Sequence, residues 1–217
     1  KVTTEQMLSK VYAAYRAANI GQRAAKPQYG NPASGGTIYL CTADGAGNMV
    51  SFIQSNYCNF GSGIVVPKTG IALQNRGFNF YMDPESANCV GPHKKTYHTI
   101  IPGFLTRNGK AIGPFGVMGG FMQPQGHVQV MMNLIDFRMN PQEALDAPRW
   151  QWTGDMNIEI EQGFPMDMVG RLKARGHHVT VATDSMDFGR GQLIFRDENG
   201  ILTGATEPRA GGAVAAW

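Results

Sequence analysis

The chain has 217 residues, of which 42% are hydrophobic and 16% charged, with a formal net charge of +3. This hydrophobic content can form the core of one large domain or two small ones, and the dispersed lysines and arginines give no basis for a nucleic-acid partner. No apolar run approaches the ~18 residues of a membrane-spanning helix, so we expect no membrane span. Glycine contributes 28 residues, about twice its average frequency, which favours many turns over a helical bundle.

The first predicted element is a helix over residues 3–19. Thr3 and Gln6 resemble a capping box, and apolar residues, Val11 among them, recur at helical spacing. From residue 20 to residue 36 this pattern stops, and glycines, prolines and polar residues replace it. We interpret that segment as an exposed linker that could be cleaved.

Alternating, β-prone segments separated by turn residues follow the linker and predict hairpins. The first hairpin turns at residues 44–48, and the second turns at Asn108-Gly109, a pair typical of tight hairpins. The strands predicted in this part of the chain are 37–43, 49–55, 70–74, 99–106 and 111–117.

The second half of the chain mixes helical blocks with further short strands. Helices are predicted at 125–137, from Asn140-Pro141 to just before Pro148, and at 167–175. Strands are predicted at 158–160, 178–182, 191–196 and 201–206. The apolar side expected for the first of these helices consists of Val128, Met131, Met132 and Ile135. Strands in hairpins and helices in separate blocks indicate an α+β fold with antiparallel sheets.

Gly36-Thr37 marks a candidate nucleophile at the start of the first strand. A threonine hydroxyl needs a neighbouring base, and its own α-amino group can serve if the chain is cut directly before it. Gly36 would permit the strained backbone in which the hydroxyl reaches the preceding carbonyl. The alternative, on these residues alone, is an ordinary loop entering a strand.

Two further positions would complete acyl-transfer chemistry around Thr37. Gly119-Gly120 stands just ahead of a predicted helix, where backbone amides can stabilise an oxyanion, although a simple strand-to-helix turn would look the same. Ser55 lies where the first hairpin returns to Thr37, so its hydroxyl could orient the nucleophile; alternatively it is an ordinary strand-end serine.

Polar residues flanking the apolar strands could line a substrate pocket. They are Arg76, Asn79, His98 and Thr99, and an arginine among them suits a substrate that bears a carboxylate. The alternative is that Arg76 is a solvated surface residue.

Cys41, Cys58 and Cys89 form an odd set without a CxxC pair, which disfavours a disulfide framework or a zinc site. We therefore expect no metal and no cofactor, with a reducing, cytoplasmic compartment slightly favoured.

Several motifs occur together in a fixed order along nearly the whole chain. They are Gly35-Gly36-Thr37, Gly47-Asn48, Phe60-Gly61-Ser62-Gly63-Ile64, the segment from Thr69 to Asn75, Met118-Gly119-Gly120, Ala147-Pro148-Arg149 and the segment from Gly204 to Arg209. In this order they resemble the γ-glutamyltransferase family, including its branch of glutaryl-cephalosporin acylases.

The resemblance implies an N-terminal-nucleophile hydrolase, an αββα sandwich with two stacked antiparallel sheets. It also implies autocleavage between Gly36 and Thr37. Residues 1–36 would then be the end of a large subunit and residues 37–217 the catalytic small subunit, paired as a heterodimer that can dimerise again. By position, Thr37 matches the nucleophile, Ser55 its supporting hydroxyl, and Gly119 and Gly120 the oxyanion-hole amides. Relatives in this family are often periplasmic or secreted.

The substrate-binding positions depart from the family's pattern. The family commonly has Asn where Tyr57 stands, Gln at Arg76, Asp at Asn79 and two serines at His98-Thr99. The aspartate normally pairs with the α-amino group of a γ-glutamyl substrate, and Asn79 lacks that charge.

The resemblance thus implies a threonine-nucleophile amidase or acyltransferase that acts on γ-glutamyl amides such as glutathione. Two alternatives remain open: a glutaryl or cephalosporin-type side-chain acylase, and a non-catalytic homologue that acts in binding or assembly.

Overall fold

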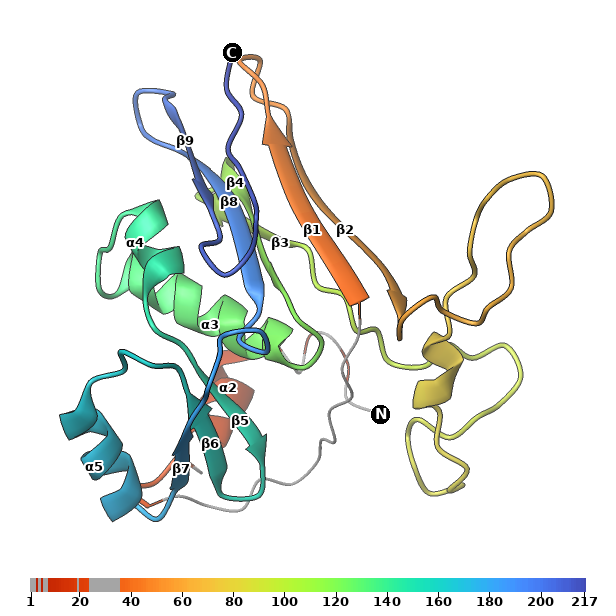
Figure 1. Ribbon diagram of the computed structural model, residues 1–217, viewed down its shortest axis with the longest axis horizontal. Helices are drawn as coiled ribbons and strands as arrows, with labels where there is room; N and C mark the ends of the chain where they lie inside the picture. The colour runs from red at the N-terminus through yellow and green to blue at the C-terminus, as the bar shows by residue number, and fades with distance from the viewer. Residues whose placement is uncertain (1–2, 4, 6–7, 19, 24–35) are drawn as a thin grey trace.

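The computed structural model describes residues 3, 5, 8–18, 20–23 and 36–217 (Figure 1). The proposed capping residue Gln6 and most of the predicted linker lie outside the described residues. Helix α2 (Lys10–Ala17) is shorter than the helix predicted there. Its Val11, expected on the apolar side, is exposed.

Three sheets account for the strands of the described chain. An antiparallel hairpin comprises β1 (Gly36–Ala43) and β2 (Met49–Tyr57). A four-stranded antiparallel sheet has the order β3-β4-β8-β9, with β3 (Gly103–Arg107), β4 (Lys110–Met118), β8 (Arg190–Arg196) and β9 (Leu202–Thr206). A smaller sheet has the order β5-β6-β7, with β5 (Trp150–Gly154), β6 (Asn157–Ile160) and β7 (His178–Val181).

The four-stranded sheet is covered on both faces (Figure 1). On one face it packs against α3 (Met122–Ile135) and α4 (Pro141–Asp146). That core comprises Val117, Val130, Leu145, Leu193 and Ala205. On the other face lies the hairpin, with the ring of the buried Tyr39 directly over Gly116 of β4. The fold is therefore α+β, and the described chain supplies three adjoining layers: helices, sheet and hairpin.

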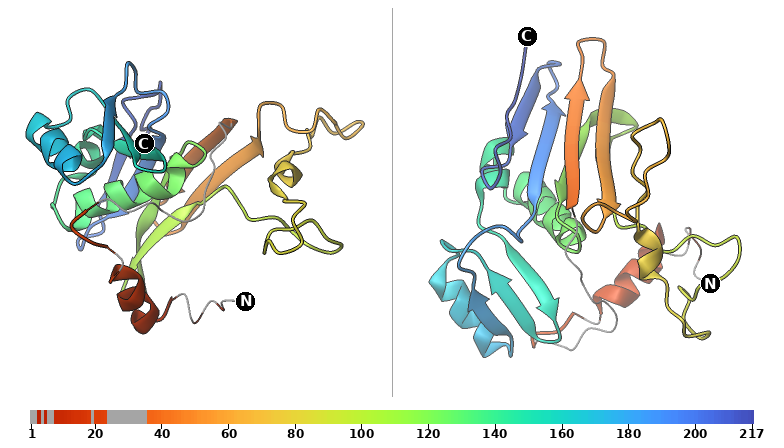
Figure 2. Two further views of the ribbon diagram at one scale, coloured as in Figure 1. Left: turned by 90° about the horizontal axis from the view of Figure 1, so that it is seen from below. Right: turned by 45° about the vertical axis from the view of Figure 1, so that its right-hand side comes forward.

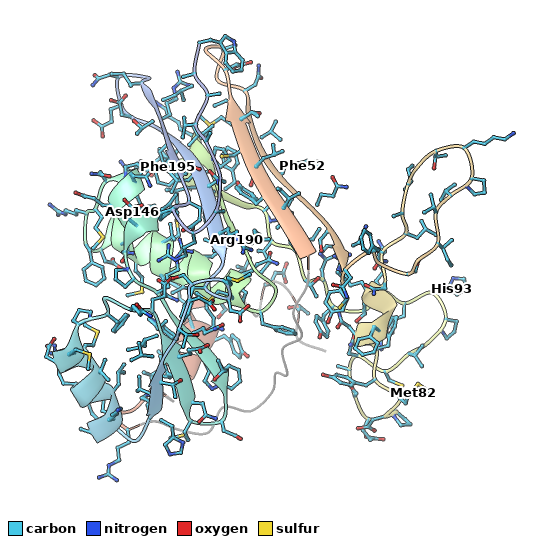
Figure 3. All side chains as sticks on the ribbon, viewed as in Figure 1. Phe52, Met82, His93, Asp146, Arg190 and Phe195 are labelled. Atoms are coloured by element: carbon cyan, nitrogen blue, oxygen red, sulfur yellow. The ribbon has the colours of Figure 1, made fainter. Side chains whose placement is uncertain are left out.

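The outer face of the hairpin is apolar and exposed. Because side chains alternate along a strand, Leu40 and its cross-strand partner Phe52 point away from the face that carries Tyr39. Both are exposed, as are Ile38 and Val50 on the same face. Figure 3 shows Phe52 on this outer side.

The small sheet packs on α5 (Met166–Ala174) through Ile158, Ile160 and Val169. Figure 2 shows it with α5 beside α3. Its strands β6 and β7 run parallel, a pairing that the sequence, which indicated antiparallel sheets, did not reveal. A parallel pair needs a crossover, and α5 supplies it between the two strands. The strand β5 was not among the predicted strands.

Two other predictions need correction. Residues 70–74 contain only an isolated bridge between Val65 and Ala72, and they belong to long loops between β2 and β3 that extend away from the sheets (Figure 1). In α3, Met131 packs on the core as expected, but Val128, Met132 and Ile135 are exposed. The buried face instead carries Met122, Gln123, Gly126 and Val130. Because Gln123 and Gly126 are not apolar in the usual sense, the sequence does not show this side of the helix as the buried one.

Among the residues that the structure describes, no helix combines the length and the apolar character needed to cross a membrane.

Candidate active site

The hydroxyl of Thr37 is held at the open end of the hairpin, opposite its turn. Thr37 is the cross-strand partner of Ser55, and its Oγ1 donates a hydrogen bond to the Ser55 Oγ at 3.0 Å. The backbone N–H of Tyr57 donates to the same Oγ at 2.9 Å. The contact predicted between the two hydroxyls is therefore present, and the serine is itself fixed by the backbone.

The backbone is irregular at the bond that precedes Thr37. The strand register shifts between Gly36 and Thr37, and Gly36 pairs with Tyr57. Tyr57 adopts a left-handed conformation with φ of 75°, which is uncommon for a residue with a side chain. Irregular ladders and rare backbone angles concentrate at functional sites. They are energetically costly and persist only where the surrounding structure sustains them.

Thr37 lines a cavity of about 200 Å³. The other residues around this cavity are Tyr57, Tyr97, His98, Thr99, Ile101, Gly120, Phe121, Gln123 and Pro124. It therefore brings together the candidate nucleophile, one of the two candidate oxyanion glycines and three of the expected substrate-binding residues.

Gly119 and Gly120 form the sharp turn between β4 and α3. Their φ angles are 143° and 56°, in the region that favours glycine. The carbonyl of Gly119 accepts a hydrogen bond from the N–H of Met122, and that of Gly120 accepts one from Gln123. In a trans peptide the next N–H points opposite to the carbonyl, so the Gly120 N–H points away from the axis of α3. This geometry suits an anion-binding turn.

Arg76 does not line the cavity but lies behind its wall. Its Nε donates to the Thr99 Oγ1 at 2.8 Å, its Nη2 donates to the Ser55 carbonyl at 3.3 Å, and its guanidinium lies 5.8 Å from the centre of the Tyr57 ring. Only 6% of Arg76 is exposed, and this burial lowers the pKa of its guanidinium. Arg76 is thus a buried cation rather than a surface residue.

Asn79 shares the short 3₁₀ helix η1 (Arg76–Asn79) with Arg76 and is also buried. Its Nδ2 has no hydrogen bond within 3.5 Å among the described residues, although the Asn79 side chain interacts with the Tyr57 hydroxyl. His98, by contrast, is exposed at the cavity. Burial raises the pKa of the Tyr57 hydroxyl, so this phenol is neutral at physiological pH and can donate a hydrogen bond.

Gln123, which sequence reasoning missed, fixes one wall of the cavity. It is 1% exposed, its Nε2 donates to the Thr99 carbonyl at 2.8 Å, and its Oε1 accepts from the Ile101 N–H at 3.2 Å. It thereby attaches the segment carrying Thr99 to the first turn of α3, beside Gly120. A glutamine in the first turn of the helix that follows the glycine turn was the available signal. No distinctive local pattern marked the remaining lining residues, which are Tyr97, Ile101, Phe121 and Pro124.

Cys41, Cys58 and Cys89 form no disulfide with one another. Within the described part of the chain, no three His, Cys, Asp or Glu side chains gather closely enough to hold a metal ion.

The sequence of this chain is similar to a known protein family and to several of its members. The sequence profile of the family described as Gamma-glutamyltranspeptidase matches residues 1–217. The glutathione hydrolase-like YwrD proenzyme of Bacillus subtilis is 37% identical over 98% of this chain. The oxamate amidohydrolase proenzyme of Klebsiella pneumoniae is 36% identical over 100% of it. The chain spans 41% and 42% of the lengths of these two relatives.

Solved structures give a consistent picture. A cephalosporin acylase from Bacillus halodurans matches with a TM-score of 0.92 and 60% identity, over 100% of this chain and 40% of that one. A gamma-glutamyltranspeptidase from Pseudomonas nitroreducens, complexed with L-DON, matches with a TM-score of 0.70 and 25% identity. That match covers 82% of this chain and 98% of the solved one.

Proposed function

Because this chain belongs to the gamma-glutamyltranspeptidase family, we propose that it carries the catalytic centre of an autocleaving amidase or acyltransferase with Thr37 as nucleophile. One observation carries the proposal. The Thr37 hydroxyl is hydrogen-bonded to Ser55 at the wall of a cavity that Gly120 also lines. This arrangement combines a positioned nucleophile with a candidate oxyanion site.

Maturation is the first reaction. Thr37 Oγ1 attacks the carbonyl carbon of Gly36, the peptide C–N bond breaks as an ester forms, and water hydrolyses that ester. The products are a carboxylate on Gly36 and a free α-amine on Thr37. The irregular register at Gly36 and Thr37 supports this step. Both relatives compared above are named proenzymes. The Pseudomonas chain covers 82% of this chain, which is close to the fraction that residues 37–217 make up.

Amide cleavage would then use the new α-amine as the base. The amine takes the proton of Oγ1 as this oxygen attacks the substrate carbonyl, and it returns the proton to the leaving amine. Ser55 orients the hydroxyl, while the amides of Gly119 and Gly120 stabilise the oxyanion. Water, or a second amine, resolves the acyl-enzyme and gives hydrolysis or transfer.

We propose a small-molecule amide as substrate, and γ-glutamyl amides are the first candidate because of the family. A glutaryl or cephalosporin-type acyl group is the second. It is favoured by Arg76 and Asn79, which place a cation and a neutral amide beside Tyr57 where the family commonly has a glutamine and an aspartate. A purely binding or assembly role is disfavoured by the intact set of Thr37, Ser55 and the two glycines. The protein partner would be the large subunit cut from the same precursor.

The test is the intact mass of the full precursor and of its Thr37→Ala variant. We expect the unmodified protein to yield a fragment that begins Thr-Ile-Tyr-Leu, and Thr37→Ala to remain one uncut chain without amidase activity. Thr42→Ala, an exposed position on the same strand, is the matched control and should be cut normally. Cleavage of Thr37→Ala at the same bond would assign the cut to another protease and refute the proposal.

A further inference from the structure

We propose that Arg149 is a positioning residue for the oxyanion site, acting through the backbone of Phe188 and Gly189 on the turn at Gly119. This inference rests on the proposed function, since it assigns a role in the same acyl-transfer step. It uses residues that do not line the cavity at Thr37.

The turn at Gly119 packs backbone to backbone against Gly189. A Cβ placed on Gly119 would lie 2.9 Å from the Gly189 Cα. A Cβ placed on Gly189 would lie 2.9 Å from the Met118 carbonyl oxygen and 2.7 Å from the Val117 Cγ1. The two glycine backbones therefore pack with no room for a side chain between them, so the position of Gly189 limits where the oxyanion turn can sit.

Arg149 holds this second backbone segment. Its Nη1 donates to the carbonyl oxygens of Phe188 and Gly189, each at 3.0 Å. Arg149 is 2% exposed and Phe188 is 1% exposed, so water has little access to replace these bonds. A planar guanidinium that donates to two successive carbonyls fixes the orientation of the segment as well as its position.

Glu207 fixes Arg149 in turn. Its Oε2 accepts from the Arg149 Nη2 at 2.8 Å and from the Gly191 N–H at 2.6 Å. Gly191 lies on β8, where it pairs with Val117 of β4. The carboxylate therefore ties Arg149 to the strand that continues from Gly189. The buried ion pair of Arg149 and Glu207 thus constrains the segment behind the oxyanion turn.

The first experiment replaces Arg149 with lysine in the full precursor. Arg149→Lys keeps the charge but loses the paired donors, so Gly189 and the turn can shift. A displacement near 1 Å in an active site can lower the rate about a hundredfold. We therefore expect kcat to fall by about ten- to a hundredfold with KM little changed.

Arg209→Lys is the matched control. Arg209 shares Glu207 with Arg149 and is similarly buried, but its donors reach the carbonyls of Leu145 and Ala147 instead of Phe188 and Gly189. We expect it to lower the melting temperature while leaving kcat nearly unchanged. Equal losses of kcat in both variants, or an unchanged kcat in Arg149→Lys, would overturn the inference.

A second variant decides the matter if Arg149→Lys fails to fold. In Gly189→Ala the added methyl group pushes directly on β4 and on the turn. Gly200→Ala is the control for placing a side chain in left-handed backbone, since Gly200 has φ of 88° in the distant β8–β9 turn. A boronic acid that forms a tetrahedral adduct on Thr37 should lose affinity in parallel with kcat/KM in Gly189→Ala only. The affinity for the product acid should stay unchanged, and parallel losses for both ligands would reject a role in oxyanion positioning.

The failure of the proposed function has a different signature. An unmodified, correctly folded precursor without any Thr37-dependent amidase activity would refute the proposed function and this inference together. Normal activity that is insensitive to Arg149→Lys and to Gly189→Ala would refute the inference alone.

Discussion

Arg76 carries a buried positive charge to which the described part of the chain supplies no carboxylate. Its contacts are neutral: a hydroxyl, a carbonyl and an aromatic ring. Burying a cation without an anion is unfavourable. Asn79 adds a buried amide that interacts with the Tyr57 hydroxyl. A negative charge on a bound substrate would stabilise the Arg76 guanidinium, and the Asn79 Nδ2 could donate to it.

We expect this charge to select the acyl group. A γ-glutamyl substrate brings an ammonium, and a like charge several ångströms away at an effective dielectric of about 20 costs roughly 2–3 kcal/mol, or at least about tenfold in affinity. A glutaryl substrate keeps the carboxylate without the ammonium. The ratio of kcat/KM for matched glutaryl and γ-glutamyl anilides should therefore be one or higher.

The double variant Arg76→Gln/Asn79→Asp should shift that ratio toward the γ-glutamyl anilide. Arg107→Gln, an exposed arginine on the distal hairpin, is the control and should leave the ratio unchanged. A strong γ-glutamyl preference in the unmodified enzyme, insensitive to the double variant, would contradict this explanation.

At the residue scale, the contact between Thr37 and Ser55 could be predicted from the sequence because a short turn sets the register. The turn pairs Ala43 with Met49, and the ladder then brings Thr37 opposite Ser55. Gln123 and Arg149 act on segments far away in the chain. Their roles depend on which carbonyls the fold brings to them, and no local pattern encodes that.

At the scale of elements, an ion pair connects the small sheet to the larger one. Glu161 follows β6, and Arg209 follows β9; both are buried, and their side chains form an ion pair. Burial alone would raise the pKa of Glu161, but hydrogen bonds from Arg209 and from the Arg149 N–H lower it overall. The folded state therefore favours the ionised carboxylate.

We expect Glu161→Gln to lower the free energy of unfolding by about 3 kcal/mol, since it removes one partner of a buried pair. The pH dependence gives a second measurement. With its folded pKa lowered, Glu161 contributes stability above the unfolded value of about 4.3, and this contribution is lost as the pH falls through the folded pKa.

Denaturant unfolding from pH 6 down to pH 3 should therefore show a steeper loss of stability in the unmodified protein than in Glu161→Gln. Asp167→Asn, which removes an exposed pair with Arg171, should behave like the unmodified protein. Parallel pH curves for the unmodified protein and Glu161→Gln would show that Glu161 is not responsible.

The elements differ in how well the sequence predicts them. Both hairpins in the first half were found, because alternation and turn residues are local signals. The crossover from β6 through α5 to β7 was not predicted, because the sequence of a short strand does not show whether it pairs parallel or antiparallel. In α3 the apolar residues were recognised, but the buried side was misassigned because Gln123 and Gly126 occupy part of it.

At the scale of the whole molecule, the chain leaves apolar surfaces uncovered. The outer face of the β1–β2 hairpin and the side of α3 that carries Val128, Met132 and Ile135 are both exposed. The chain spans about 40% of the length of the relatives compared above. Apolar surfaces of this kind normally lie against another part of a protein. We expect the remainder of the precursor to cover the hairpin face.

The isolated chain should therefore self-associate or melt at a lower temperature than the full precursor. Light scattering after gel filtration and thermal unfolding measure both properties. Leu40→Ser/Phe52→Ser should reduce self-association of the isolated chain and weaken assembly of the full precursor, whereas Thr203→Ser on β9 should affect neither. A monomeric isolated chain with one cooperative, high-temperature transition would contradict the expectation.

Glu207 lies far beyond Thr37 in the sequence, and this separation has a consequence for the order of events during synthesis. The nucleophile and the bond before it are made before β9 and Glu207, which follow them in the chain. If the oxyanion turn depends on Glu207 through Arg149, a nascent chain cannot cut itself until β9 has joined the sheet. Completion of the fold would then act as the signal for maturation, and the two subunits would stay covalently joined until they had assembled.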